Sequence, residues 1–416
     1  METRINNHER LSTCIVVLVL QLQVFRRLSM AGYMVILLLA YLYWFSSIGI
    51  TKRFKTNVVG FLFLISYLGL PIISIFNTDI SDYFTALMRY CALMPFYFIA
   101  FTHSRLIYKY RVDLMRIYCI VVFFASVLTF YQILFGRISF FVDIENGRIG
   151  YERYGSLLGS VTTYGTASLS AIFCLHSFKL FTKKWSVLLE VVIVLGGIVC
   201  LSKAFYINAM IAYFLIFLFN GKKNRSIGDV VKAIGIIGVG IVAVWIAINY
   251  TFIGDYFHGM MDYTFASNRY GTESALADRL YKLPSEAFEY HNMPFFYYLL
   301  CGVGFKGYGG VLGIRFPQCH NNYADILLAQ GLLGLVSLVL VYLSSFTKLL
   351  REKTEEASFI KQIVIYALIN MMAGQWMYLA VTTSLFLCII FSIYSNHRCD
   401  QTLIADSPLE VSLIED

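Results

Sequence analysis

Long apolar runs separated by short polar segments form the dominant pattern along this chain. Most runs approach the roughly 20 residues that a helix needs to cross a bilayer. They are continuous, whereas the strands of an outer-membrane barrel would alternate apolar and polar residues. The pattern therefore predicts an all-α, polytopic transmembrane bundle of about 11–12 helices. The runs cover approximately residues 11–25, 31–50, 57–76, 85–102, 113–135, 155–178, 185–201, 204–220, 229–250, 322–346, 359–379 and 381–395.

Composition and charge further restrict the class of protein to which this chain can belong. Hydrophobic residues make up 58% of the 416 and charged residues only 14%, against roughly 25% charged in an average soluble domain. This composition excludes a water-soluble globule and a disordered chain. The formal net charge is +8, yet no basic face lies on a soluble module, so nucleic acid is not an expected partner.

The cations gather in short clusters at residues 52–55, 105–111, 179–184, 222–225 and 348–353, each between two apolar runs. Short loops rich in Lys and Arg remain in the cytoplasm and attract the anionic membrane lipids. We therefore expect these clusters to be cytoplasmic loops, with both termini on the same side. Arg89, Glu190 and Asp325 lie inside apolar runs close to their ends, where snorkelling to the surface would explain them.

The chain is expected to divide at its one sizeable polar stretch. Residues 1–250 form an N-terminal transmembrane bundle, 251–320 a large extracytoplasmic loop with short helices, 321–395 the C-terminal transmembrane helices, and 396–416 a cytoplasmic tail. The many aromatic residues of the loop favour order over disorder. Cys301 and Cys319 could form a disulfide there or remain reduced, and their spacing decides neither.

Two sequence features lie at the C-terminal end of this loop. A glycine-rich segment at 302–310 could cradle phosphate with its backbone N–H groups, or could simply be a turn back into the bundle. It is not a P-loop, because no Lys-Ser/Thr follows it. His320-Asn321 then precedes the next apolar run.

Four stretches of the chain form a recognisable set: His320-Asn321 with Gly331-Leu332-Leu333-Gly334, Arg279 to Leu283 with Cys301-Gly302-Val303-Gly304-Phe305, Leu201-Ser202-Lys203-Ala204, and Arg153-Tyr154-Gly155. Together they resemble a family of bacterial membrane proteins, the O-antigen ligases and the O-antigen or capsule polysaccharide polymerases. The similarity covers about 150–346, with two departures: Lys203 stands where the family usually has Arg, and Thr162-Thr163-Tyr164 where many members have Pro-Asn.

The resemblance implies a GT-C-like fold in the bacterial inner membrane and a polyprenyl-diphosphate-linked oligosaccharide as substrate. A polymerase would move the growing glycan onto another lipid-linked repeat unit, whereas a ligase would move it onto lipid A–core. Both activities share the motifs, and the balanced charge of the aromatic loop leans toward the polymerase. A chain-length regulator and a flippase are the partners that the resemblance implies. A lipid-linked oligosaccharide transporter is a further alternative.

The resemblance also implies roles for four residues. Breaking the anomeric C–O bond leaves a lipid diphosphate, whose negative charge would be stabilised by Arg279 and Lys203, with Arg153 as a third cation. His320 would be the general base that accepts the proton of the attacking hydroxyl. Arg279 and His320 are thus the catalytic candidates of a metal-independent, inverting transfer with no cofactor.

Each of these residues also has a purely structural explanation. His320 could cap backbone groups at the start of the following helix, and Arg279 could be a surface charge paired with Asp278 or Glu286. Lys203, at the tip of a helical hairpin, could be a snorkelling anchor.

Replacing Arg279 by Lys separates the two explanations of that residue. Arg279→Lys keeps the charge but loses the planar fork that binds a diphosphate through two parallel hydrogen bonds. We expect a substantial loss of glycan transfer, measured with purified protein and lipid-linked repeats. Activity close to the wild type would reduce Arg279 to a generic surface charge.

Overall fold

The computed structural model describes residues 2–22, 30–48, 55–69, 80–136, 138, 156–158, 161–199, 203–219, 249–250, 285, 300, 302, 321–373 and 381–405. This part of the chain is helical and contains no strand beyond an isolated bridge residue at Ser156, so the predicted all-α class is confirmed for it. The elements are α1 (Glu2–Gln21), α3 (Met30–Ile48), α4 (Val58–Leu64), the π-helix η1 (Ile65–Gly69), α6 (Ile80–Thr102), α7 (Ser104–Phe135), α8 (Val161–Ser177), α9 (Lys183–Val199), α10 (Lys203–Phe219), α16 (Asn322–Leu349), α17 (Glu355–Ala373) and α18 (Val381–Ala405).

Three of the described helices are long and apolar enough to cross a membrane: 31–48 in α3, 104–135 in α7 and 322–349 in α16. Shorter apolar helices accompany them at Val58–Tyr67, Cys91–Thr102, Asn208–Phe219 and Ser384–His397. The prediction of helices long and apolar enough to cross a membrane is thereby confirmed for the three longer segments.

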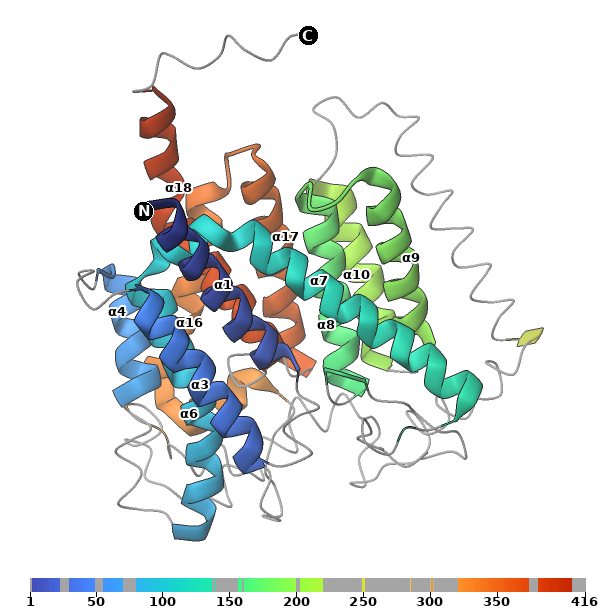
Figure 1. Ribbon diagram of the computed structural model, residues 1–416, viewed down its shortest axis with the longest axis horizontal. Coiled ribbons are helices and arrows are strands. Elements are labelled where there is room, and N and C mark those ends of the chain that lie inside the picture. Colours follow the sequence, from blue (N-terminus) through green and yellow to red (C-terminus); the bar gives the residue numbers. More distant parts are fainter. Residues whose placement is uncertain are drawn as a thin grey trace.

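The helices stand side by side in a bundle (Figure 1). Helices α1, α3, α4 and α6 lie on one side, α8, α9 and α10 lie on the other, and α7 crosses diagonally between the two groups. We call the end that holds the starts of α1, α7 and α17 and the last turns of α16 and α18 the charged end. The end where α8, α10 and α16 begin is called the motif end, because segments of the family motifs lie there.

Helix α7 corrects the predicted loop at 105–111. It begins at Ser104 and continues without a break through the basic cluster into the apolar run. Its 32 residues span about 48 Å, well beyond the roughly 30 Å of a hydrocarbon core. Helical hydrogen bonds are local and need no apolar side chains, and ion pairs accommodate the charges: Arg10 of α1 contacts Asp113 at 2.8 Å, and Lys109 lies 3.8 Å from Glu9.

The expected tail at 396–416 begins as helix. Helix α18 continues to Ala405, ten residues beyond the end of its apolar run. Helix α1 likewise begins at Glu2, although its apolar run begins at about residue 11. Hydrophobicity marks the part of a helix that is buried, not the place where the helix ends.

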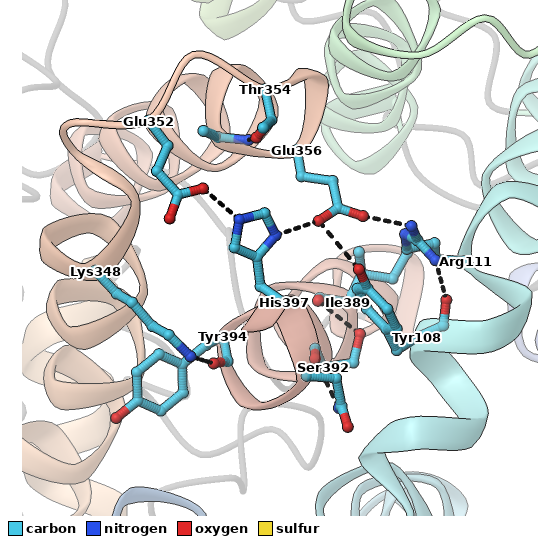
Figure 2. Close-up of polar contacts among 12 residues, drawn as sticks. Tyr108, Arg111, Lys348, Glu352, Thr354, Glu356, Ile389, Ser392, Tyr394 and His397 are labelled. Carbon is cyan, nitrogen blue, oxygen red and sulfur yellow. Dashed lines mark hydrogen bonds and ion pairs between the residues drawn. The ribbon is translucent and has the colours of Figure 1, made fainter. Parts of the chain in front are cut away.

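A charged cluster joins three helices at the charged end (Figure 2). The imidazole of His397 on α18 lies between two carboxylates: Nδ1 is 2.6 Å from Oε2 of Glu356, and Nε2 contacts Glu352. The guanidinium of Arg111 on α7 pairs with the second oxygen of Glu356 and stacks over the ring of Tyr108, 3.8 Å from its centroid. The imidazole of His397 thus bridges the two carboxylates.

Two further contacts hold α18 at the same level. Lys348 of α16 donates to the carbonyl of Tyr394, and Asn396 donates to the hydroxyl of Ser104 at 3.1 Å. Helices α7, α16 and α17 therefore all bind the same two turns of α18.

Removal of the imidazole is expected to destabilise the protein through this cluster. His397→Ala leaves two carboxylates without their shared donor, and breaking such a buried pair costs about 3 kcal/mol. We expect the midpoint of thermal unfolding in detergent to fall by several degrees.

Arg10→Ala serves as the control, because the Arg10 side chain is 54% exposed and its ion pair with Asp113 contributes at most about 1 kcal/mol. Equal shifts for the two variants would contradict a special role of the His397 cluster.

Candidate functional site

The structure describes only part of the predicted site. His320, Arg279 and Arg153 lie outside the described residues, as do Cys301 and Cys319. Lys203 is the first residue of α10, and its side chain is not described. The site is therefore characterised through its described neighbours on α8, α10, α16 and α17.

Asn321, the second residue of the His-Asn motif, caps helix α16. Its Oδ1 accepts hydrogen bonds from the backbone N–H groups of Tyr323 at 3.1 Å and Ala324 at 3.4 Å. An N-cap amide of this kind stabilises a helix start by about 1 kcal/mol. The backbone N–H of Tyr323, one of the groups that His320 could have capped, is thus bound by Asn321.

Two glycines from separate motifs meet in the structure. Gly331 breaks the regular geometry of α16 with φ 65° and ψ −168°, a conformation essentially restricted to glycine. Gly302, with φ 64°, lies against this kink: a Cβ atom there would be 2.4 Å from the carbonyl oxygen of Leu328 and 2.6 Å from the nitrogen of Gly331. The backbone at Gly302 therefore lies beside α16 at a point roughly 10 Å along the helix from its start.

Close packing in the α9–α10 hairpin determines where Lys203 lies. A Cβ atom on Gly197 would be 2.2 Å from the ring of Phe205, so only glycine permits this approach of the two helices. The hydroxyl of Tyr206 donates to the carbonyl of Ile198 at 2.7 Å and ties the first turn of α10 to the last turn of α9. The backbone of Lys203 is consequently held at the motif end.

Helix α17 links α10 and α16 at the motif end. Asn208 of α10 donates to Oδ1 of Asn370 at 2.6 Å, and Tyr323 of α16 donates to the carbonyl of Leu368 at 2.9 Å. Both asparagines are buried. The helices that begin at Lys203 and just after His320 are thus bound to the same turn of α17.

The departure from the family pattern at residues 162–164 has a structural explanation. Tyr164 is fully buried, and its hydroxyl donates to Ser126 of α7 at 2.7 Å. A Cβ atom on Gly196 of α9 would lie 2.1 Å from the same hydroxyl. Tyr164 therefore packs α7, α8 and α9 together. Ser156, three residues after Arg153, is also buried and donates to the carbonyl of Ala125 at 2.5 Å.

The intramembrane charges differ from one another. Glu190 does not need to snorkel, because one carboxylate oxygen accepts from Tyr213 at 2.9 Å and lies 2.8 Å from Nε2 of His176. Sequence reasoning missed this contact because its three residues lie on three helices. Asp325 lies in the first turn of α16, where the helix dipole favours a negative charge. The side chain of Arg89 is not described.

Among the described residues, no group of three or more His, Cys, Asp or Glu side chains could hold a metal ion. At the motif end, asparagine, tyrosine and backbone groups supply the hydrogen bonds described above.

The chain was also compared with known proteins. No protein-family model matches it, and no curated protein is significantly similar to it. The family resemblance thus remains a prediction that rests on the four stretches of sequence.

A methyl group at Gly302 tests the contact between the two motif glycines. Gly302→Ala forces the new Cβ atom into the backbone of α16 and adds about 1–2 kcal/mol of backbone strain at positive φ. We expect a lower midpoint of thermal unfolding in detergent.

Gly136→Ala is the matched control, since Gly136 also has a positive φ of 88° but nothing within 4 Å of the added atom. A loss at Gly302 no larger than the loss at Gly136 would show that the contact with α16 contributes nothing.

Proposed function

We propose that the protein is a polysaccharide repeat-unit polymerase of a bacterial inner membrane. It transfers a growing glycan from polyprenyl diphosphate to the terminal sugar of another lipid-linked repeat unit. In this proposal the chain is a multi-pass protein with a GT-C-like arrangement, and residues 251–320 form its large periplasmic loop. A chain-length regulator and a flippase would be its functional partners.

The supporting observation is the meeting of the motif segments at one end of the bundle. Asn321 caps α16, Gly302 contacts Gly331, and α10 begins with Lys203. Helices α10 and α16 are bound to a single turn of α17. Segments separated by more than a hundred positions thus lie at the same end of the bundle, which supports a shared substrate site.

The proposed chemistry needs a base on one side of the anomeric carbon and cations on the other. His320 would accept the proton of the attacking hydroxyl, and Arg279 and Lys203 would stabilise the departing diphosphate, assisted by Arg153. Direct displacement inverts the anomeric centre. The balance of charge is complete without a cofactor, since the departing diphosphate carries away the electrons of the broken C–O bond.

The test incubates purified protein with lipid-linked repeat units from its host and resolves the products on a ladder gel. We expect a ladder of increasing chain length. His320→Ala should lower the rate of transfer by roughly 100-fold or more, as expected when a general base is removed. Unchanged thermal unfolding of the variant would exclude a folding defect, and appreciable residual transfer would remove His320 as the base.

The other candidate functions give different products. Transfer of preformed polymer only after lipid A–core is added would identify a ligase. Activity in detergent, where no membrane separates two compartments, would exclude the transporter. No transfer under either condition would contradict both enzymatic functions.

A further inference from the structure

The turn of α17 at the motif end, Leu368–Asn370, accepts hydrogen bonds from two other helices. Asn208 donates to Oδ1 of Asn370 at 2.6 Å, while Nδ2 of Asn370 donates to the carbonyl of Tyr366 at 3.3 Å on its own helix. The second bond fixes the rotation of the Asn370 amide, so that its oxygen faces α10. Tyr323 binds the carbonyl of Leu368 from the α16 side.

These bonds attach each helix close to a residue of the proposed site. Asn208 follows Lys203 by five residues, or roughly 7 Å along α10, and Tyr323 follows His320 by three. An amide pair buried between apolar helices is directional and has no water to replace a lost partner. The bonds therefore restrict the relative position of α10 and α16 more tightly than apolar packing would.

We infer that Asn370 and Tyr323 are positioning residues, through which α17 sets the spacing of α10 and α16, the helices that begin at Lys203 and just after His320 in the chain. This inference rests on the proposed function, which gives Lys203 and His320 their roles. In an inverting displacement the base and the diphosphate cation act on opposite sides of one carbon atom. A displacement of about 1 Å can lower the rate about 100-fold while binding is retained.

The first test compares two leucine substitutions on α17. We expect Asn370→Leu to lower kcat by roughly 10- to 100-fold and to change KM for the lipid-linked repeat by less than about threefold. Gln362→Leu is the matched control: Gln362 is also fully buried and also accepts an interhelical bond, from Ser177 at 3.2 Å, but two turns nearer the charged end. Equal losses of kcat in the two variants would reduce the effect to general helix packing and overturn the inference.

Two further variants separate positioning from stability. Tyr323→Phe removes one hydroxyl and keeps the ring, and we expect kcat to fall while the unfolding midpoint changes little. The double variant Asn208→Leu/Asn370→Leu replaces both amides by apolar groups, which restores stability relative to the single variants because no polar group is left unpaired. Its kcat should stay low, since the contact between two leucines is not directional and does not fix the relative position of the helices. Recovery of wild-type kcat would overturn the inference.

A distance measurement tests the geometry without any enzymatic assay. Spin labels at Met210 on α10 and Leu333 on α16, both exposed, report the spacing of the two helices. The labels are attached through a non-canonical amino acid, because the chain contains nine cysteines. We expect the distance distribution to shift or broaden in Asn370→Leu and to remain unchanged in Gln362→Leu.

The two readouts distinguish failure of the inference from failure of the proposed function. An active wild type whose Asn370→Leu variant keeps both kcat and the distance distribution overturns the positioning role. A wild type that forms no ladder overturns the polymerase, and the distance distribution then still decides whether α17 sets the spacing of α10 and α16.

Discussion

Polar groups inside this apolar bundle must find partners within the protein, since neither lipid nor packed hydrocarbon accepts a hydrogen bond. Some of the described hydroxyls bond to a carbonyl of their own helix, as Ser168 does to Tyr164, and others join two helices. The indole of Trp44 on α3 donates to Thr13 of α1 at 2.8 Å, and the hydroxyls of Ser66 and Ser337 join η1 to α16 at 2.7 Å. The arrangement of the helices therefore depends on matching donors with acceptors as well as on filling space.

The two ends of the bundle meet this constraint with different chemistry. At the charged end, His397, Glu356 and Arg111 form ion pairs among α7, α17 and α18. At the motif end, the neutral amides of Asn208 and Asn370 join α10 to α17. Helix α17 takes part in both sets of contacts, so a single helix connects the charged end to the motif end, where the proposed site lies.

The glycines of the motif segments show how far sequence reasoning extends to the site. The family resemblance placed Gly302 and Gly331 in separate motifs, and the glycine-rich segment left a phosphate cradle and a simple turn both open. The structure shows that Gly302 has a packing role, since its missing side chain allows contact with the kink of α16. Nothing along the sequence could reveal this contact, because it joins segments that only the folded bundle brings together.

For the described residues, the sequence by itself determined the helical class, the three helices long and apolar enough to cross a membrane and the approximate extent of most helices. These properties are local, because helical hydrogen bonds and hydrophobic length depend on consecutive residues. It did not determine the real ends of α7 and α18, where charged turns continue the helix with partners on other helices. Only the tertiary structure decided which polar residues pair, as in Glu190 with His176 and Tyr213 or Asn208 with Asn370. Such pairs depend on which faces of distant helices meet, and this is a property of the packed bundle rather than of any stretch of the chain.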